Sequence, residues 1–325
     1  MLRKSNALVA GLLFVVAVVP AIAQTKHPLE TRNAALRYWL AFADLQDPPA
    51  DKGTVDLLEK TATGDAPWDE EKLGPILDKN EDAIWRMQRA TKLPDCDWGL
   101  EYDLGPRVSI AYVPKARVLA RLNTLEGMRL LAKGDSQKAV DTWLAGVRFS
   151  QHLTKGGALI FSLIAKMALL SNFNALTHAA QAGSLNEAQR KQVETAVRAL
   201  PETGFDWSAA LWYEQDPLDV VVKQLKSAEN RAAYYEGVTG KPAPENLEVP
   251  NPAEIAKFHK LMAAAIAAMK LPPEQAKEKL KIMQDSVKSL HPLYQQLAPS
   301  FTRVNEARAQ VQSARQKLLE ALPSR

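Results

Sequence analysis

The chain has 325 residues, 46% of them hydrophobic, and its 41 basic and 37 acidic residues leave a formal charge of only +4. Basic and acidic residues are interleaved, whereas a nucleic-acid-binding protein carries a concentrated basic stripe, so no nucleic-acid partner is expected. The single cysteine, Cys96, cannot form an internal disulfide, so burial of apolar side chains must hold the fold together.

The N-terminus has the three parts of a signal peptide. Arg3 and Lys4 precede an apolar run that ends at Val19, and small residues follow up to Ala23, where signal peptidase would cleave. The run is shorter than the roughly 20 residues that span a bilayer, so an uncleaved anchor is the less favoured alternative. Removal of residues 1–23 would take the charge from +4 to +2, because both basic residues leave. A periplasmic or extracellular protein without an integral membrane segment is therefore expected.

Hydrophobic residues recur at three- and four-residue spacing almost everywhere, which predicts an all-α fold. In the first expected helix, Leu36, Trp39, Leu40 and Ala43 form the apolar face. Residues 158–182 are the most apolar part of the mature chain and are expected to form a central buried helix. The expected helices before residue 239 cover 32–46, 54–60, 75–92, 113–133, 136–152, 158–182, 186–200 and, with an interruption near Pro217, 207–236.

Residues 239–251 concentrate prolines and glycines in a polar stretch. This stretch is the expected linker between a helical domain, residues 24–238, and a C-terminal helical segment, residues 252–325. Apolar residues of that segment follow a heptad pattern from Ala276 to Leu318. Because Pro292 and Pro299 interrupt the pattern, a hairpin of long helices that folds back on the N-terminal body is favoured. The alternative is a homodimer that forms through Ala276 to Leu318.

One stretch resembles a tetratricopeptide repeat. From Leu125 to Leu153, small and aromatic residues have the spacing of that family, namely Gly127, Gly134, Ala139, Trp143 and Gly146. Small residues let two antiparallel helices approach closely, with Trp143 in the groove between them. Residues 183–188 repeat the pattern of 134–139 more weakly. The resemblance implies helical hairpins stacked in an α-solenoid that binds proteins or peptides on a concave surface.

A longer run resembles a set of exported, helical bacterial proteins of no known activity. The residues that carry this likeness are Asp95-Cys96-Asp97-Trp98, Pro114, Arg117, Leu119, Arg121 and Gly134-Asp135. The likeness implies architecture only, because fold-level analogy does not fix a ligand.

The motifs of common enzyme classes are missing from the sequence. No two of the five histidines have the i, i+4 spacing that places two imidazoles around zinc on one helix face. A Gly-x-Ser-x-Gly elbow, a phosphate-binding glycine loop and a dinucleotide fingerprint are also missing. No catalytic residue, metal site or cofactor is therefore expected, and a non-enzymatic protein is favoured.

Residues 95–103 combine four carboxylates with two aromatic residues. Crowded carboxylates beside an aromatic ring suit a glycan-binding or glycan-cleaving site, in which the binding residues would be Asp97, Trp98, Glu101, Tyr102 and Asp103. The more favoured interpretation is that Trp98, Cys96 and Tyr102 anchor the loop on the helical core. The flanking aspartates disfavour the Cys96 thiolate, so a nucleophile is not expected there.

A second aromatic group contains Trp207 and Trp212, which would either line a binding groove or pack in the core. The leading hypothesis is an exported, non-enzymatic helical-repeat protein that binds an envelope protein or peptide. The alternatives are a glycan-acting envelope enzyme that uses the loop 95–103, and a structural envelope protein that self-associates through Ala276 to Leu318.

Overall fold

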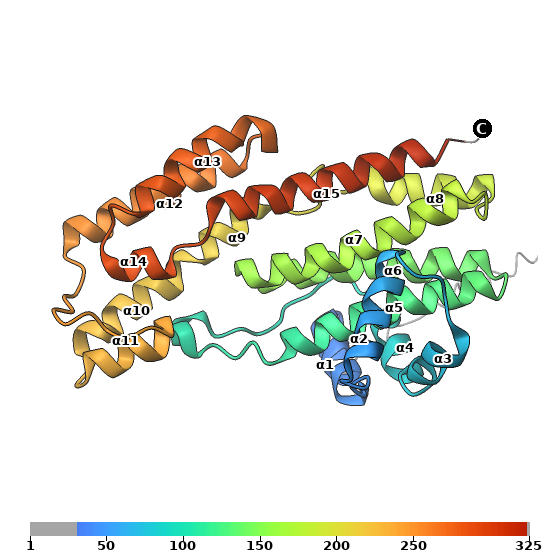
Figure 1. Ribbon diagram of the computed structural model, residues 1–325, viewed down its shortest axis with the longest axis horizontal. Helices are drawn as coiled ribbons and strands as arrows, with labels where there is room; N and C mark the ends of the chain where they lie inside the picture. Colours follow the sequence, from blue (N-terminus) through green and yellow to red (C-terminus); the bar gives the residue numbers. More distant parts are fainter. Residues whose placement is uncertain (1–30, 324–325) are drawn as a thin grey trace, which may run out of the picture. The chain divides into compact units, whose positions relative to one another are not determined.

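The computed structural model describes residues 31–323, so the predicted signal peptide lies outside the described residues. From Arg32 onward, the described residues form one compact unit. The described part of the chain is all-α, as predicted, and contains no β-strand (Figure 1). Its helices are α1 (Ala34–Asp44), α2 (Lys52–Thr63), α3 (Glu70–Asp78), α4 (Glu81–Ala90), η1 (Tyr102–Arg107), α5 (Tyr112–Ala132), α6 (Ser136–Leu153), η2 (Thr154–Gly156), α7 (Leu159–Gln181), α8 (Glu187–Arg198), α9 (Trp207–Tyr213), α10 (Gln215–Ser227), α11 (Arg231–Thr239), α12 (Pro252–Met269), α13 (Pro273–Val287), α14 (Pro292–Leu297) and α15 (Phe301–Ala321).

The first helix buries a different face from the apolar face expected. Tyr38 and Phe42 are buried among other aromatic rings, whereas Leu36 and Leu40 are each 55% exposed and Trp39 is 41% exposed. Both faces are apolar, so the sequence pattern does not decide between them. The face with Tyr38 is buried because its ring and hydroxyl find partners in the loop after α4 and at the end of α6.

The prediction of a single helix over residues 75–92 is wrong, because the structure contains two helices there, α3 and α4. The first begins before Pro75, with the Asp69 carboxylate accepting a hydrogen bond from the backbone N–H of Lys72. Asn80 lies between the two helices with its side chain buried. Its side-chain amide donates a hydrogen bond to the carbonyl of Ile76 and accepts one from the backbone N–H of Gln46. These two hydrogen bonds fix the bend between α3 and α4.

The α5–α6 hairpin has the close approach that the repeat-like spacing predicts. Gly134 adopts a left-handed conformation with a φ of 83° in the turn, and Asp135 caps α6 through the backbone N–H of Lys138. A Cβ atom on Gly127 would lie 2.2 Å from Nε1 of Trp143. That nitrogen donates to the carbonyl of Thr124 at 3.1 Å, so Trp143 is wedged between the two helices.

The two stretches with similar sequences, 134–139 and 183–188, lie side by side. Gln189 at the start of α8 donates to the Ser136 hydroxyl at 3.0 Å, and Gln137 donates to Gln192 at 3.1 Å. Gly183, like Gly134, has a positive φ where the preceding helix ends. The helices that follow the two stretches, α6 and α8, therefore pack against each other with related turns at their beginnings.

Helix α7 lies at the centre of the fold, as predicted. It packs against α5 and α6 on one side and α15 on another (Figure 1). By length and composition it is the one helix among residues 31–323 that could cross a membrane, with a mean hydropathy of 1.6 over its most apolar window. Half of that window is buried within the protein, which is typical of a core helix.

The C-terminal helices fold back on the earlier part of the chain, as the prolines predict. The heptad pattern is divided among α13, α14 and α15, and each of these begins at or just after a Pro or Ser. Leu280, Tyr294 and Leu318 in the pattern are fully buried within one chain, and α15 packs along α7 (Figure 1). A homodimer through Ala276 to Leu318 stays a prediction, and it would require these packed helices to separate.

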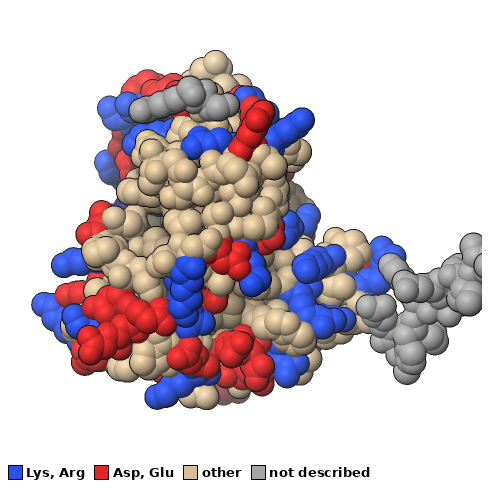
Figure 2. Space-filling model, turned by 90° about the vertical axis from the view of Figure 1, so that its right-hand side faces the viewer, with Lys and Arg blue, Asp and Glu red and all other residues tan. Residues whose placement is uncertain are grey.

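Charged side chains of both signs are distributed over the surface. On the face drawn in Figure 2, Lys and Arg alternate with Asp and Glu around an uncharged region. Residues 240–251 connect α11 to α12 without a helix.

Candidate functional site

Two of the predicted binding residues are buried. Trp98 is 4% exposed, stacks on Tyr112 with ring centroids 4.5 Å apart, and donates from Nε1 to the carbonyl of His152. Trp207 is 1% exposed and donates from Nε1 to the carbonyl of Thr203. Both indoles therefore anchor their segments to the helical core, and neither offers a face to a ligand.

The other predicted residues lie at the surface. Asp97, Glu101 and Asp103 are exposed on the loop between α4 and α5. Tyr102 is half-buried, and its hydroxyl accepts a hydrogen bond from the backbone N–H of Ala158. Trp212 is 52% exposed on α9. Because Tyr213 contacts the rings of both Tyr102 and Trp212, the structure brings these two predicted residues into one aromatic group.

The end of α6 joins the loop 95–98 to α1 through buried polar groups. The Tyr38 hydroxyl lies 2.7 Å from Nδ1 of His152, and the Cys96 thiol lies 3.7 Å from the carbonyl of His152. Burial lowers the pKa of His152 to about 4 and raises the pKa of Cys96 to about 12, with Asp97 adding to the shift of Cys96. Cys96 is therefore a protonated thiol near neutral pH and not a nucleophile.

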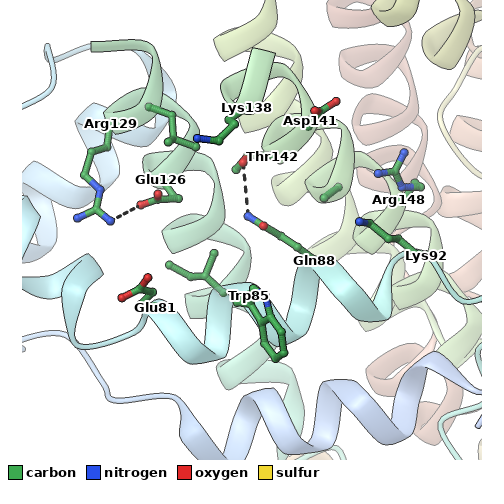
Figure 3. A pocket seen from close by; sticks show the side chains of 13 residues that line it. Glu81, Trp85, Gln88, Lys92, Glu126, Arg129, Lys138, Asp141, Thr142 and Arg148 are labelled. Carbon is green, nitrogen blue, oxygen red and sulfur yellow. Dashed lines mark hydrogen bonds and ion pairs between the residues drawn. The ribbon is translucent and has the colours of Figure 1, made fainter. Parts of the chain in front are cut away.

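A groove of about 480 Å³ lies between α4 and the α5–α6 hairpin (Figure 3). Helix α4 contributes the outer wall, and its Trp85 is 49% exposed there. The neighbouring Ile84 is buried, because only one of two consecutive helical residues can face the core. The residues that line the groove are Glu81, Ile84, Trp85, Gln88, Lys92, Glu126, Arg129, Leu130, Lys138, Asp141, Thr142, Ala145 and Arg148.

Hydrogen bonds between side chains fix the floor of the groove. The Gln88 amide donates to the side-chain oxygens of Asn123 and Thr142, at 3.1 and 3.5 Å. Asn123 is fully buried and donates to the carbonyl of Thr142 at 2.9 Å. The network joins one residue from each of the three helices, so hydrogen bonds within the protein hold the floor together.

The two ends of the groove differ in charge pairing. At one end, Glu126 lies 2.9 Å from Arg129, which also binds Asp78. Desolvation raises the pKa of Glu126, although Arg129 opposes the shift. At the other end lie Lys92 and Arg148, and among the described residues neither makes an ion pair (Figure 3).

The sequence did not identify this groove. Trp85 lies in the stretch 75–92, where a single amphipathic helix is expected, and the polar lining residues come from three separate helices. One feature of the sequence does indicate that Trp85 is exposed. The buried face of α4 is already filled by Ala83, Ile84 and Met87, which leaves Trp85 on the outer side.

Residues 31–323 contain no group of three or more His, Cys, Asp or Glu side chains that could hold a metal ion. Comparisons with protein-family models, curated proteins and solved structures gave no match to the chain.

Proposed function

We propose that this protein binds a peptide segment of another protein in the groove between α4 and the α5–α6 hairpin. The observation that carries the proposal is Trp85, a large aromatic side chain left 49% exposed beside a polar groove with a fixed floor. Exposed aromatic residues next to convergent hydrogen-bonding groups are typical of surfaces that bind proteins.

The shape and lining of the groove favour an extended segment over a small molecule. Polar, charged and apolar side chains all line it, and Gln88, Thr142 and Asp141 offer hydrogen-bonding groups along its length. Hydrogen bonds to a peptide backbone need such groups in sequence, whereas small-molecule pockets are mostly apolar and enclosed. We place this binding in the bacterial envelope on the basis of the N-terminal signal-peptide pattern.

The α5–α6 hairpin supports the same proposal. It has the small residues, the wedged Trp143 and the left-handed glycine of the tetratricopeptide-like pattern, and it forms one wall of the groove. Proteins built from such hairpins commonly bind peptides on the surface that the hairpins form.

A site-specific crosslinking experiment tests the proposal. A photoreactive amino acid is placed at Gln88 in the groove, and at Ile282, which is 67% exposed on α13, as a control. After irradiation with envelope extract, we expect a discrete crosslinked protein from position 88 only. Trp85→Ala should then abolish the crosslink, because it removes the aromatic anchor.

Trp212→Ala is the matched control, because Trp212 is exposed to nearly the same extent but lies on α9. If Trp212→Ala abolishes binding and Trp85→Ala does not, the binding site is the aromatic group around Tyr102 and Tyr213. If the protein instead retains or cleaves glycans and Asp97→Asn removes that property, the function is glycan recognition at the loop 95–103 and the peptide proposal is wrong.

A further inference from the structure

The outer face of α1 is an apolar surface next to the groove. Leu36, Trp39 and Leu40 have the i, i+3, i+4 spacing that places side chains on one helix face, and all three are more than 40% exposed. Isolated exposed apolar residues are ordinary, but a contiguous group of large ones marks an interaction surface.

Between this face and α4 lies a depression of about 230 Å³. Leu40 and Trp85 form its apolar part, and its remaining lining residues are Arg37, Arg86 and Arg89. The guanidinium of Arg89 lies 4.7 Å from the centre of a Trp85 ring, which holds both side chains in place. Arg86 is paired with Asp44, so less of its charge is available to attract a ligand.

Trp85 lines both the depression and the α4–α6 groove. The two hollows therefore meet at this indole, one on the side of α1 and the other on the side of α6. In Figure 3 the indole extends from α4 on the side away from Glu126 and Lys138. A chain that lies across Trp85 would contact both hollows.

The charges along this path do not cancel. Among residues 31–323, four basic side chains that line the two hollows make no ion pair, namely Arg37, Arg89, Lys92 and Arg148. Of the acidic lining residues, Glu126 is paired with Arg129, and Asp141 accepts hydrogen bonds from Gln137 and Gln192. Among residues 31–323, two acidic lining residues, Glu81 and Asp141, therefore make no ion pair, and the four basic side chains without one outnumber them.

We infer that the occupant is an acidic peptide segment that carries an apolar side chain. The apolar side chain would contact Trp85 and Leu40, while carboxylates on either side would meet Arg37 and Arg89 in one hollow and Lys92 and Arg148 in the other. Arginine suits this role because its planar guanidinium can bind a carboxylate through two parallel hydrogen bonds. The inference rests on the proposed function and adds the chemical class of the partner.

A peptide fits these observations better than a membrane surface. Leu40 and Trp85 line hollows, which accept protruding side chains, whereas a bilayer surface is met by side chains that protrude from a convex face. The basic residues also line the hollows themselves, where the carboxylates of a bound segment would lie.

Three short fluorescent peptides test the inference by fluorescence anisotropy with the full-length mature protein. All three share a central Leu-Phe pair, which is flanked by Asp and Glu, by Ser, or by Lys. We expect the acidic peptide to bind at least about tenfold more tightly than the Ser peptide at low ionic strength, and this difference to shrink as salt is added.

Charge reversal provides the variant test. Arg37→Glu combined with Arg89→Glu should weaken the acidic peptide about tenfold or more and allow the Lys peptide to bind, which loss of folding could not produce. Arg303→Glu, an exposed arginine on α15, is the matched control and should leave all three affinities unchanged.

The outcomes separate the inference from the proposed function. If all three peptides bind equally and Trp85→Ala weakens each of them, the groove binds peptides but the acidic preference is wrong. If no peptide binds although the crosslink from position 88 forms, the inference is wrong and the proposed function stands; if that crosslink is absent too, both fail. If phosphatidylglycerol vesicles bind instead, and Leu36→Ser with Leu40→Ser removes that binding, the surface contacts membranes and the inference is overturned.

Discussion

His152 connects three segments of the chain through different atoms. Its Nδ1 meets the Tyr38 hydroxyl of α1, and its carbonyl accepts a hydrogen bond from Trp98 in the loop after α4. Burial, together with the nearby charges of Lys155 and Arg148, lowers the pKa of its imidazole to about 4. The neutral ring is therefore the form that the folded protein accommodates.

This shift predicts a loss of stability in mild acid. In the unfolded chain His152 takes up a proton near pH 6.5, but in the folded chain it does so only near pH 4. Between these values the unfolded state binds more protons, so the free energy of unfolding falls as the pH falls. We expect His152 to contribute a loss of about 2 kcal/mol between pH 7.5 and pH 5.

Urea unfolding of His152→Gln at both pH values measures this contribution. The variant should be less stable at pH 7.5 but should lose less stability on acidification than the unchanged protein. His178→Gln, which alters an exposed histidine on α7, should follow the unchanged protein at both pH values. An equal loss in the His152 variant would show that other groups cause the acid sensitivity.

Among the elements, the α5–α6 hairpin has the least room for a larger side chain. Gly127→Ala would place a methyl group 2.2 Å from Nε1 of the fully buried Trp143. The steric overlap should cost about 1–3 kcal/mol of stability. This cost should exceed the stabilisation of up to about 1 kcal/mol that alanine's higher helix propensity provides. We expect a lower free energy of unfolding by thermal or urea denaturation.

Gly237→Ala on α11 is the matched comparison, since no atom lies within 4 Å of the added Cβ atom. Here only the helix propensity acts, and the variant should be more stable by about 0.5–1 kcal/mol. An unchanged Gly127→Ala would contradict the packing described for the hairpin, and a destabilised Gly237→Ala would contradict the open space around Gly237 on α11.

The sequence predicts elements well where local residues leave little choice. The small residues and the turn of the α5–α6 hairpin favour one close packing, and the apolar composition of α7 favours a central position, so both were predicted. Helix α1 has two apolar faces, so periodicity could not choose between Tyr38 and Leu36. The bend between α3 and α4 depends in part on the hydrogen bond that Asn80 accepts from Gln46, a residue distant in sequence, which no local pattern contains.

The candidate groove was less predictable than the helices that form it. Trp85 appears apolar in the sequence, and its exposure depends on which face α4 turns to α5 and α6. Gln88, Asn123 and Thr142 are ordinary polar residues until the three helices bring them within hydrogen-bonding distance. Trp98 and Trp207 were candidates for binding because they belong to aromatic groups in the sequence, but both are buried, and large aromatic side chains more often fill a core.

Across the whole molecule, the C-terminal helix belongs to the same packed body as the central helix. Lys166 of α7 donates to Gln310 of α15, and Arg190 of α8 donates to the carbonyl of Ala321. All seven tryptophans lie before residue 239, so their fluorescence reports only on the earlier part of the chain.

Leu318→Ala on α15 should therefore shift the tryptophan fluorescence transition. The side chain is fully buried, and its removal should lower the free energy of unfolding by about 2–5 kcal/mol. If the chain unfolds as one cooperative unit, tryptophan fluorescence and far-ultraviolet circular dichroism will give the same lowered midpoint.

Ile282→Ala, on the exposed side of α13, should leave that midpoint unchanged. If Leu318→Ala lowers the midpoint measured by circular dichroism but not the midpoint measured by tryptophan fluorescence, the chain contains two independent folding units. Residues 239–251 would then be the linker between them.

The position of α15 also bears on how the chain is made. Helix α7, the most apolar in the described part of the chain, has one of its covering helices, α15, more than 100 residues later in the sequence. A chain that emerges N-terminus first, from a ribosome or a translocation channel, must hold that face of α7 uncovered until residues 301–321 have emerged. During this interval the nascent protein would be a substrate for holding chaperones, and a stop codon before Phe301 would make that state permanent.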